Sequence, residues 1–377
     1  VTKTIAFLLS DLQNGGTEWF AINLARNFKK RGYGVVFLLA NERGDLLPLI
    51  REEFPIIGLG GDGYSLIGLC RSLPPLLRYL RQTPPDVMIS GLPLVNMLAG
   101  VASFLAQSKT KLIVVEHIRL CPKATQTCWF RHILKSWMIK ISHALATDYV
   151  CVSQTVARDL YKVFPKDRSI LNKIIYNPII PENFKELVDS PVDHPWLKKK
   201  REHPFPLCVS VGRLLKNKDY LTVIDAFTRL RQQLPQARLL ILGEGEERAV
   251  LEASIREKNL EDAVSLPGPV PNVFPYLKAA DLFVLASHSE AFGNVIVEAL
   301  ACGVPIVSTD SGGPREILCD GVYGKLVPVA EPAAMAQAML ETLESTPDRN
   351  KLQQRGLRFA VNEAADAYVR LFESLAV

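Results

Sequence analysis

Residues 207–242 read LCVSVGRLLKNKDYLTVIDAFTRLRQQLPQARLLIL, and this stretch decides the fold class. Two apolar runs, Leu207–Val211 and Arg238–Leu242, have the length and composition of buried strands. Between them, apolar residues recur at helical spacing from about Tyr220 to Leu234. A strand, a helix and a second strand in this order form a right-handed crossover that pairs the strands in parallel. The stretch therefore predicts an α/β domain built on a parallel sheet.

The same alternation runs through both halves of the 377-residue chain, whose length leads us to expect two domains. The other predicted strands are Thr4–Leu9, Gly34–Leu39, Pro55–Leu59, Val87–Ser90, Lys111–Val115, Ala146–Cys151, Val264–Leu266, Leu282–Ala286, Pro305–Ser308 and Gly324–Val327. The other predicted helices are Glu18–Arg31, Leu66–Arg81, Val95–Leu105, Trp129–His143, Glu246–Glu257, Asn294–Cys302 and Ala333–Leu343, with a helical segment from about Asn350 to Val377. Prolines and charges from Asn177 to Pro206 interrupt the rhythm, so we interpret that segment as an interdomain linker.

The pattern predicts an N-terminal Rossmann-like domain at residues 1–183 and a C-terminal one at residues 184–357. Ligands of such sheets bind at the carboxyl ends of the strands. We therefore expect the functional site in a cleft where the two halves face each other.

Composition and charge narrow the class of protein. Hydrophobic residues make up 48% of the chain and charged residues 22%, which excludes an intrinsically disordered protein. Residues 1–185 carry 23 Lys and Arg against 13 Asp and Glu, whereas residues 186–377 carry 21 against 26. The basic half suggests an anionic partner, such as a phosphate-bearing lipid or a membrane surface. The lack of zinc-finger spacing and of an RNA-binding aromatic motif argues against nucleic acid.

The segment Ser289–Asn294 is the strongest candidate for a binding site. It follows a predicted strand, carries Glu290, and frees the backbone at Gly293, where a helix begins. The start of that helix presents unpaired N–H groups and a positive dipole end, which suits a diphosphate. Glu298 lies one turn deeper on the same face as Asn294. The carboxylates of Glu290 and Glu298 can therefore accept hydrogen bonds from hydroxyl groups on either side of a phosphate. Taken alone, a loop carboxylate and a solvated helix carboxylate would be the ordinary interpretation.

A glycine turn with two cations strengthens the binding-site interpretation. Gly212 and Arg213 follow a predicted strand, and Lys218 precedes the next helix. Two cations at a strand-to-helix junction can hold the charge that builds on a departing diphosphate. A surface Arg and Lys without such neighbours would mean little.

Two further glycine turns connect predicted strands to predicted helices. Thr309-Asp310-Ser311-Gly312-Gly313-Pro314 should place Pro314 at the first helical position, where no N–H is needed. Gly15-Gly16-Thr17-Glu18 follows the first strand, with Thr17 as the expected N-cap. Each turn is common by itself, but both are expected to open onto the same cleft.

Together these motifs resemble a known family. The set Gly15-Gly16-x-Glu18, Gly212-Arg213-x4-Lys218, Glu290-x7-Glu298 and Gly312-Gly313-Pro314 resembles family four of the retaining glycosyltransferases with the GT-B fold. The resemblance is dense from about Val209 to Val329 and sparse before it. It implies two Rossmann-like domains that face each other across a cleft, with a C-terminal helix, about residues 358–377, that crosses back to the N-terminal domain.

The resemblance also implies roles for individual residues. Arg213 and Lys218 match cations that bind the donor diphosphate, and Glu290 matches a carboxylate that touches the hydroxyls of the transferred sugar. Glu298 matches a carboxylate that holds the nucleotide ribose. His117, after a predicted strand, matches a histidine that faces the donor sugar, although a lone histidine there is more often a packed or capping residue. The other implied donor contacts are the backbone amides of Phe292, Gly293 and Asn294 and the turns at Gly15, Gly16 and Gly212.

The resemblance therefore implies a hexosyltransferase. It should move a hexose or N-acetylhexosamine from a nucleotide-diphosphate sugar, and UDP is the nucleotide that the family uses most often. The acceptor should be lipid-linked or an oligosaccharide, in lipopolysaccharide, surface-polysaccharide or glycolipid synthesis. Retention is expected through front-side attack, in which a phosphate oxygen takes the proton of the acceptor hydroxyl and the protein positions the reactants. No Asp-x-Asp pair occurs, so Arg213, Lys218 and the helix ends should replace a metal, and no cofactor is expected.

Two other functions fit the same fold. A nucleotide-sugar 2-epimerase needs acid–base residues for elimination and should lack the Glu290-x7-Glu298 arrangement. A nucleotide-sugar-binding regulator with an inactive site is the alternative without catalysis, and the intact set of candidate site residues argues against it.

One motif mimics a different binding site. Gly58-Leu59-Gly60-Gly61-Asp62-Gly63, with Asp86 about twenty residues on, fits the dinucleotide fingerprint. That fingerprint belongs to the first βα turn of its domain, and here the turn comes third. We therefore do not predict NAD binding.

Cysteine usage and hydropathy bear on location. The seven cysteines include no C-x-x-C pair, which predicts reduced core residues of a cytosolic protein rather than metal ligands. The first apolar run is predicted to be a strand and not a signal peptide, and no segment is apolar for long enough to span a membrane. A cytoplasmic protein is expected, with peripheral contact on the inner face of the cytoplasmic membrane as one option.

That option depends on the segment from Trp129 to Ile141. Apolar residues recur there at helical spacing, with Arg131, Lys135 and Lys140 interleaved. Such a helix can lie at an anionic membrane interface with its Trp rings at headgroup depth. It can equally cover the sheet while its cations extend to solvent. The sheet-covering interpretation is favoured, because a basic amphipathic stretch only suggests membrane contact.

Overall fold

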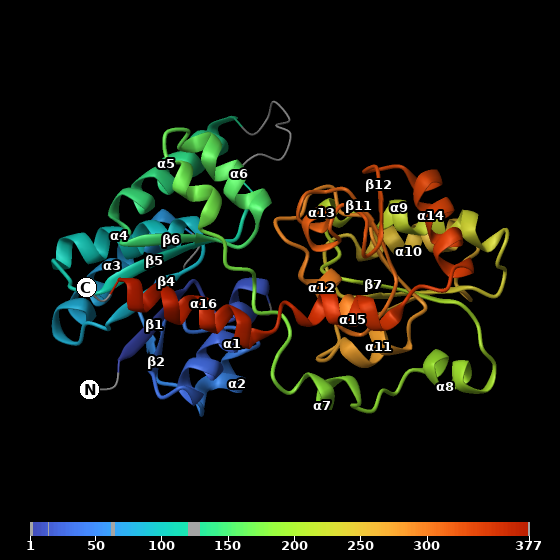
Figure 1. The fold of residues 1–377 in the computed structure, drawn as a ribbon, viewed down its shortest axis with the longest axis horizontal. Helices are drawn as coiled ribbons and strands as arrows, with labels where there is room; N and C mark the ends of the chain where they lie inside the picture. The colour runs from blue at the N-terminus through green and yellow to red at the C-terminus, as the bar shows by residue number, and fades with distance from the viewer. Residues whose placement is uncertain (1–2, 14, 62–64, 120–128, 376–377) are drawn as a thin grey trace. The chain divides into compact units, whose positions relative to one another are not determined.

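The apolar runs form the strands of two separate parallel sheets (Figure 1). The computed structural model describes residues 3–13, 15–61, 65–119 and 129–375. Its contacts divide the chain into one unit of Val1–Ile179 with Val361–Val377 and a second unit of Ile180–Ala360. Each unit holds one six-stranded sheet with helices packed against it, which confirms the predicted pair of Rossmann-like domains.

The sheet of the first unit has the strand order β3-β2-β1-β4-β5-β6, with all strands parallel. Its strands are β1 (Thr4–Leu9), β2 (Gly34–Leu39), β3 (Ile56–Gly58), β4 (Val87–Ser90), β5 (Lys111–Glu116) and β6 (Asp148–Cys151). The connecting helices are α1 (Gly16–Lys30), α2 (Leu47–Arg51), α3 (Leu66–Gln82), α4 (Pro93–Ala106), α5 (Trp129–Leu145) and α6 (Gln154–Val163), and a 3-10 turn, η2, spans Arg168–Asn172.

Both faces of this sheet are buried, and successive residues of a strand point to opposite faces, so strand residues on both sides point into a core. On β1, Leu8 belongs to the core that α3 and α4 complete. The neighbouring Phe7 points the other way and stacks on Phe28 of α1, with ring centroids 6.4 Å apart. Near-continuous apolar strands are therefore what this sheet requires.

The last helix of the chain, α16 (Val361–Ser374), belongs to the first unit, as expected for the fold. Its Tyr368 and Phe372 are buried, and the Phe372 ring lies 5.5 Å from that of Phe28 on α1. An ion pair of 2.5 Å between Arg31 and Asp366 joins the same two helices. The predicted single helical segment is in fact two helices, α15 (Arg349–Leu357) and α16.

The sheet of the second unit has the order β12-β11-β10-β7-β8-β9, which repeats the topology of the first sheet. Its strands are β7 (Leu207–Val211), β8 (Arg238–Leu242), β9 (Val264–Gly268), β10 (Leu282–Leu285), β11 (Ile306–Thr309) and β12 (Lys325–Val327). The helices are α9 (Tyr220–Arg231), α10 (Arg248–Glu257), α11 (Phe274–Ala279), α12 (Asn294–Ala301), α13 (Gly313–Ile317) and α14 (Pro332–Glu344), and a 3-10 turn, η3, spans Lys216–Lys218.

Most of the segment interpreted as a linker, residues 180–206, belongs to the second unit, whereas residues 177–179 belong to the first. It contains α7 (Phe184–Val188) and α8 (Pro195–Glu202). The Phe184 ring packs edge-on against Phe274 of α11 at 5.1 Å, and Lys200 pairs with Asp281. Prolines and charges dominate its composition, but a few buried apolar anchors fix it to the domain.

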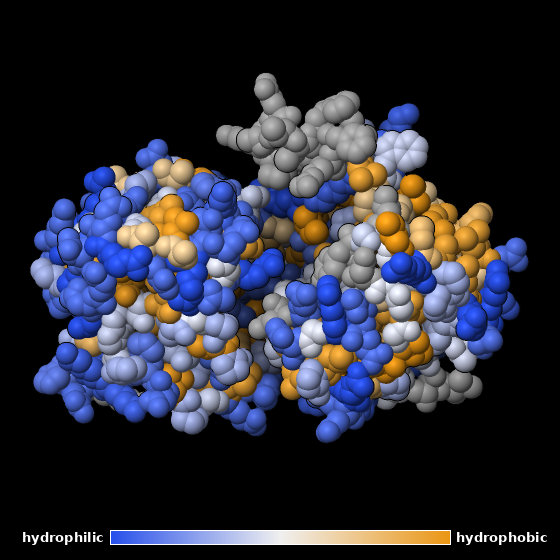
Figure 2. Space-filling model, turned by 180° about the vertical axis from the view of Figure 1, so that it is seen from behind, coloured by the Kyte–Doolittle hydropathy of each residue, from blue (hydrophilic) through white to orange (hydrophobic). Residues whose placement is uncertain are grey.

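The surface is mainly hydrophilic with hydrophobic patches, as Figure 2 shows for one face. Within the described residues, no helix is both long and apolar enough to cross a membrane. Of the described cysteines, Cys151 and Cys208 are buried, whereas Cys70 is exposed, so the prediction that the cysteines are core residues is wrong for Cys70. Cys121 and Cys128 lie outside the described residues.

Candidate functional site

The topology of the second sheet brings together residues that are far apart in the sequence. Strands β7 and β10 are neighbours, but the chain continues from them toward opposite edges of the sheet. A parallel sheet opens a crevice at the carboxyl ends of two such strands. Gly212 and Arg213 directly follow β7, and the loop that carries Glu290 follows β10. The predicted cations and the predicted carboxylate therefore meet at this switch point.

Lys218 and Glu290 form the centre of the site. Lys218 Nζ lies 2.5 Å from Glu290 Oε1, and the two side chains are 20% and 13% exposed. Ser287 Oγ donates a second hydrogen bond of 2.7 Å to the same oxygen. Among the described residues, Glu290 Oε2 accepts no hydrogen bond. One oxygen of the carboxylate is thus fixed by the protein, and the other is available to a ligand.

The backbone of Glu290 is held by the turn after β11. Its N–H donates to Ser311 O at 3.0 Å, and its carbonyl accepts from Gly313 N at 3.0 Å. A Cβ atom on Gly313 would overlap the carbonyl of Phe292, so this close approach requires glycine. The turn predicted from Gly312 to Pro314 therefore supports the site, although α13 begins at Gly313 and Pro314 is its second residue, not its first.

Arg213 supplies a cation that has no partner in the described part of the chain. Its side chain is exposed, and no described residue forms a hydrogen bond or ion pair with its guanidinium. The preceding residue, Gly212, lies close to the buried Tyr220 of α9, whose hydroxyl would be 2.9 Å from a Cβ atom at Gly212. The turn thus fixes the backbone of Arg213 while its charge stays in solvent.

The helix α12 follows the Glu290 loop and begins after Gly293, its N-cap. Phe292 is buried, and its ring packs against Phe359 at 5.5 Å, so its side chain belongs to the domain core. Glu298 is half-buried on α12, and burial raises the pKa of its carboxyl to about 7. Among the described residues, its carboxylate has no hydrogen-bond or ion-pair partner. An unpaired carboxyl in a desolvated position is a candidate ligand contact.

Gly15, Gly16 and His117 lie in the first unit, after the carboxyl ends of β1 and β5. A Cβ atom built on Gly91 would lie 3.0 Å from Nε2 of His117 and 3.1 Å from Cγ2 of Thr17, so His117 lies beside the turn at Gly15 and Gly16. The prediction that Thr17 is the N-cap of the helix that follows this turn is wrong. The N-cap of α1 is Gly15, which has no side chain to cap the helix. A Cβ atom on Gly15 would overlap Oε2 of the buried Glu18, so the glycine leaves room for that carboxylate.

His117 is a neutral side chain at this edge. Its ring packs edge-on against Phe20 at 4.7 Å, and burial lowers the pKa of the imidazole to about 3. Nε2 is buried without a hydrogen-bond partner among the described residues. A neutral imidazole in this environment can exchange hydrogen bonds with a hydroxyl group but carries no charge for a phosphate.

Ser287 and His288 are site residues that the sequence did not reveal. Ser287 touches Glu290, and its carbonyl accepts a hydrogen bond of 2.7 Å from Thr309 Oγ1. His288 Nε2 lies 3.6 Å from Asp219 Oδ2, and the backbone N–H of His288 donates to Asn217 O at 2.8 Å. In the sequence, these two residues could have been identified as candidates only from their position in the loop between β10 and Glu290.

The acidic residue of the dinucleotide-like motif does not lie where a nucleotide would bind. Asp86 accepts a hydrogen bond of 2.7 Å from Thr4 N, which is the first residue of β1. Asp86 therefore lies at the amino ends of the strands, opposite the edge where a nucleotide would bind. Asp62 and Gly63 lie outside the described residues.

Helix α5 has both a buried and an exposed side. Ile139 is fully buried, as the sheet-covering interpretation requires. Trp137 is 63% exposed, Leu134 is 43% exposed, and Lys140 is exposed as well. The side chains of residues 129–133 lie outside the described part of the chain. The helix thus covers the sheet and also presents an apolar and basic stripe.

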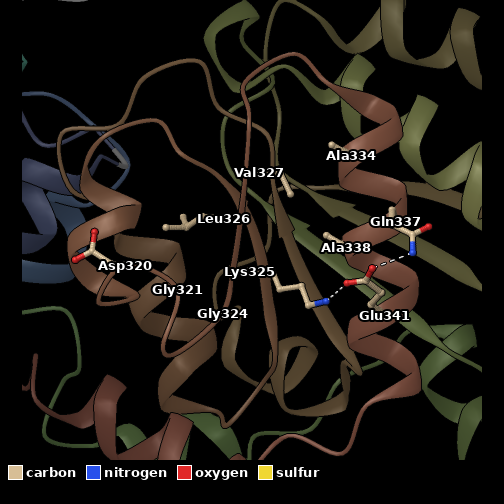
Figure 3. Close-up of a pocket in the computed structure, with 10 residues that line it drawn as sticks. All are labelled: Asp320, Gly321, Gly324, Lys325, Leu326, Val327, Ala334, Gln337, Ala338 and Glu341. Atoms are coloured by element: carbon tan, nitrogen blue, oxygen red, sulfur yellow. Dashed lines mark hydrogen bonds and ion pairs between the residues drawn. The ribbon is translucent and has the colours of Figure 1, made fainter.

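A pocket of about 490 Å³ lies elsewhere on the second unit, between β12, α14 and the turn at Asp320 and Gly321 (Figure 3). At its wall Lys325 pairs with Glu341, which also accepts a hydrogen bond of 2.9 Å from Gln337. The lysine charge is thus neutralised within the pocket. None of the residues predicted for the site lines it.

Two family models match the chain over most of its length. Residues 14–183 match the model described as Glycosyltransferase Family 4, and residues 196–359 match the model described as Glycosyl transferases group 1. The two matched ranges correspond closely to the two units of the structure.

Curated relatives carry names of the same class. The chain is 34% identical over 174 residues to a lipopolysaccharide core biosynthesis glycosyltransferase, LpsE, of Rhizobium meliloti, which is 45% of this chain and 50% of that protein. It is 34% identical over 215 residues to an N-acetylgalactosamine-N,N'-diacetylbacillosaminyl-diphospho-undecaprenol 4-alpha-N-acetylgalactosaminyltransferase of Campylobacter jejuni, which is 54% of this chain and 58% of that protein. The matches thus span between half and two thirds of these relatives' own lengths.

Solved structures share the fold along the whole chain. Anabaena Alr3699/HepE in complex with UDP and glucose superposes with a TM-score of 0.81 at 22% identity, covering 99% of this chain and 100% of that one. WaaG, a glycosyltransferase involved in lipopolysaccharide biosynthesis, gives a TM-score of 0.72 at 17% identity, covering 96% and 99%. At these identities, the likeness shows the fold.

Proposed function

The chain belongs to the glycosyltransferases that join a family 4 domain to a group 1 domain in the GT-B fold, and from this we propose the reaction that it catalyses. It transfers a hexose or N-acetylhexosamine from a nucleotide-diphosphate sugar to a lipid-linked or saccharide acceptor, with retention of anomeric configuration. The second unit binds the donor, and the first unit binds the acceptor.

One observation carries the donor assignment: Arg213 and the Lys218–Glu290 pair lie together at the switch point of the second sheet. Lys218 has three N–H donors and gives one to Glu290, which leaves two for phosphate oxygens. The unpaired Arg213 adds a planar cation suited to phosphate. The two charges stabilise the diphosphate as it departs, in the role that a metal ion has in other transferases.

Two carboxylates contact the rest of the donor in this proposal. Glu290 Oε2 accepts a hydrogen bond from a hydroxyl of the transferred sugar, because Oε1 is already occupied by protein donors. Glu298 accepts hydrogen bonds from the ribose hydroxyls. The backbone amides of Phe292, Gly293 and Asn294, at the start of α12, serve the sugar and the phosphate.

The chemistry follows from positioning and charge. The acceptor oxygen forms a bond to the anomeric carbon on the face from which the diphosphate departs, while the bond from that carbon to the diphosphate oxygen breaks. The acceptor proton passes to a phosphate oxygen, so no side chain is needed as a base. His117, neutral because of its burial, aligns a sugar hydroxyl without competing for the phosphate.

Comparisons favour a uridine nucleotide and an acceptor of surface-polysaccharide synthesis. The similar Anabaena structure is described in complex with UDP and glucose. The name of one relative specifies a diphospho-undecaprenol acceptor, and that of another specifies lipopolysaccharide core biosynthesis. A UDP-sugar donor and a lipid-linked acceptor are therefore the first pair to test.

A lipid-linked acceptor implies contact with a membrane, and α5 offers a surface for it. It exposes the apolar side chains of Leu134 and Trp137 together with the cation of Lys140, the combination that binds an anionic interface. Replacing Trp137→Glu together with Lys140→Glu should abolish sedimentation with vesicles that contain anionic lipid, and donor binding should be unchanged. The matched control is Phe104→Glu with Lys109→Glu, a pair near the end of α4 with an equally exposed ring. Unchanged sedimentation of the α5 variant would contradict this surface.

The donor assignment is tested with a panel of nucleotide sugars. UDP-glucose, UDP-galactose, their N-acetylamino forms and GDP-mannose are scored for thermal stabilisation and for slow hydrolysis without acceptor. We expect one UDP-sugar to stabilise the protein more than UDP alone, because the sugar adds the Glu290 contact. Stabilisation by none of them would contradict the proposed function.

A further inference from the structure

We propose that Ser287 is a positioning residue for Glu290, and that it thereby sets which hydroxyl configuration of the donor sugar the site accepts. The inference rests on the proposed function, because it concerns the carboxylate assigned to the transferred sugar. Ser287 does not touch the sugar in this proposal and acts through Glu290 alone.

The geometry places two donors on a single oxygen. Ser287 Oγ lies 2.7 Å and Lys218 Nζ 2.5 Å from Glu290 Oε1. A carboxylate held at one oxygen from two directions cannot rotate about its last side-chain bond without losing a charge-assisted hydrogen bond. The direction of Oε2, the oxygen without a partner among the described residues, is therefore fixed.

Ser287 is itself held rigidly, which a positioning role requires. The residue is completely buried, two residues after the end of β10. Its carbonyl accepts the hydrogen bond from Thr309 Oγ1 at the end of β11, and Thr309 is also completely buried. The support thus runs from two neighbouring strands through Ser287 to the carboxylate.

Lys218 alone would not fix the carboxylate in the same way. Its ammonium is a point charge on a flexible four-carbon chain, and it must also serve the phosphate when the donor is bound. The serine hydroxyl is short and buried, and it is committed to one acceptor. Without it, Glu290 keeps its charge and its ion pair but gains freedom to turn Oε2 toward a different hydroxyl.

The consequence is a loss of discrimination rather than a loss of nucleotide binding. A site that accepts a hydrogen bond from one hydroxyl rejects a sugar whose hydroxyl points elsewhere, because its buried carboxylate oxygen is then unpaired. C4 epimers such as UDP-glucose and UDP-galactose differ in one hydroxyl direction. They are therefore the natural pair for measuring the orientation of Glu290.

The experiment compares Ser287→Ala with Ser308→Ala. Ser308 is the matched control, because it is equally buried and its hydroxyl bonds to a backbone carbonyl, that of Thr309, instead of to Glu290. For each protein, kcat and KM of donor hydrolysis are measured with UDP-glucose and UDP-galactose, and again with the N-acetylamino forms of both. The Kd of UDP is measured separately.

We expect Ser287→Ala to reduce the ratio of kcat/KM between the preferred donor and its C4 epimer about tenfold, with the larger part in kcat. The Kd of UDP should stay within about twofold, and Ser308→Ala should change neither quantity. An unchanged ratio in Ser287→Ala would overturn the inference. An equal fall of the ratio in both variants would overturn it too, since it would reflect general loosening. If the wild-type protein hydrolysed none of these donors, the proposed function itself would fail, which is a separate result.

Discussion

The loops after the first strands of the two sheets have the same backbone structure but opposite charge. In the first unit, Leu12 N donates to Arg43 O at 2.9 Å, and Leu12 O accepts from Leu46 N at 2.9 Å. In the second unit, Leu214 N donates to Glu244 O at 2.8 Å, and Leu214 O accepts from Glu247 N at 3.0 Å. Leu12 and Leu214 are therefore equivalent positions of the two sheets.

The residues just before these leucines are Asp11 and Arg213, and their environments differ. Asp11 is completely buried and pairs with Arg43 at 3.2 Å, whereas Arg213 is exposed and its guanidinium has no partner among the described residues. One loop thus presents a free cation at the ligand edge of its sheet, while the other encloses an anion. The comparison indicates that topology determines where a ligand binds, at the carboxyl ends of the strands. The side chains at that edge of the sheet then determine which ligand binds there.

The cation side of this comparison should give the largest effect. We expect Arg213→Ala to lower kcat/KM for donor hydrolysis about a hundredfold to a thousandfold, because it removes a charge that stabilises the departing diphosphate. Lys216→Ala is the control, since Lys216 is an exposed lysine of the same loop. Steady-state kinetics measure both. Equal activity of the two variants would show that the free cation of the second unit has no part in donor chemistry.

The shared backbone of the two loops can be tested by stability. Cβ atoms on Gly44 and Gly245 would overlap the carbonyls of Leu12 and Leu214, respectively. Each glycine-to-alanine change should therefore lower the free energy of unfolding by about 3 kcal/mol. Gly32→Ala is the control, because nothing lies within 4 Å of its added Cβ and only its φ of +87° is unfavourable. In a denaturant titration, a large difference between Gly44→Ala and Gly245→Ala would contradict the equivalence of the loops, and a loss no greater than that of Gly32→Ala would contradict the steric argument.

Glu298 should make stability depend on pH. Burial raises the pKa of its carboxyl from an ordinary 4.5 to about 7, so the folded protein favours the neutral form. The wild type should therefore lose stability relative to Glu298→Gln as the pH rises from about 4.5 to about 7, by roughly 3 kcal/mol in all. Glu261→Gln, at an exposed site of the same unit, should show no such trend. Thermal unfolding of the three proteins across this range measures the difference, and parallel curves would contradict it.

The smallest effect is expected in the first unit, where the site is neutral. His117→Ala should lower kcat for donor hydrolysis about tenfold through the loss of one hydrogen bond to the sugar. Because the pKa of His117 is about 3, the wild-type pH–rate profile should show no step from this residue above about pH 4. His203→Ala, at an exposed position, is the control. A step near neutral pH that disappears in His117→Ala would show that the histidine titrates during the reaction.

The sequence predicted most elements closely and some connections wrongly. Strands such as Thr4–Leu9 and Arg238–Leu242 have the predicted bounds, because their long apolar runs are needed on both faces of a buried sheet. Helix α9 ends at Arg231 rather than Leu234, and Gly15 replaces Thr17 as an N-cap. Such ends depend on individual backbone hydrogen bonds, which a periodic pattern does not specify.

The predicted linker shows where local composition misleads. Its prolines and charges have the statistics of an exposed connection. What fixes it is the contact of Phe184 with Phe274 and of Lys200 with Asp281, residues about ninety and eighty positions away. No local signal reports a partner at that distance in the chain.

By itself, the sequence determined the α/β class, the two domains and the residue types of the donor site, because alternating periodicity and glycine turns act locally. The tertiary structure decided how those residues are used. It placed Lys218 and Ser287 on one oxygen of Glu290, left Arg213 in solvent and buried Asp11 at the equivalent position. The contact of Lys218 with Glu290 depends on the order of strands in the second sheet, which brings together two residues that are 72 positions apart along the chain.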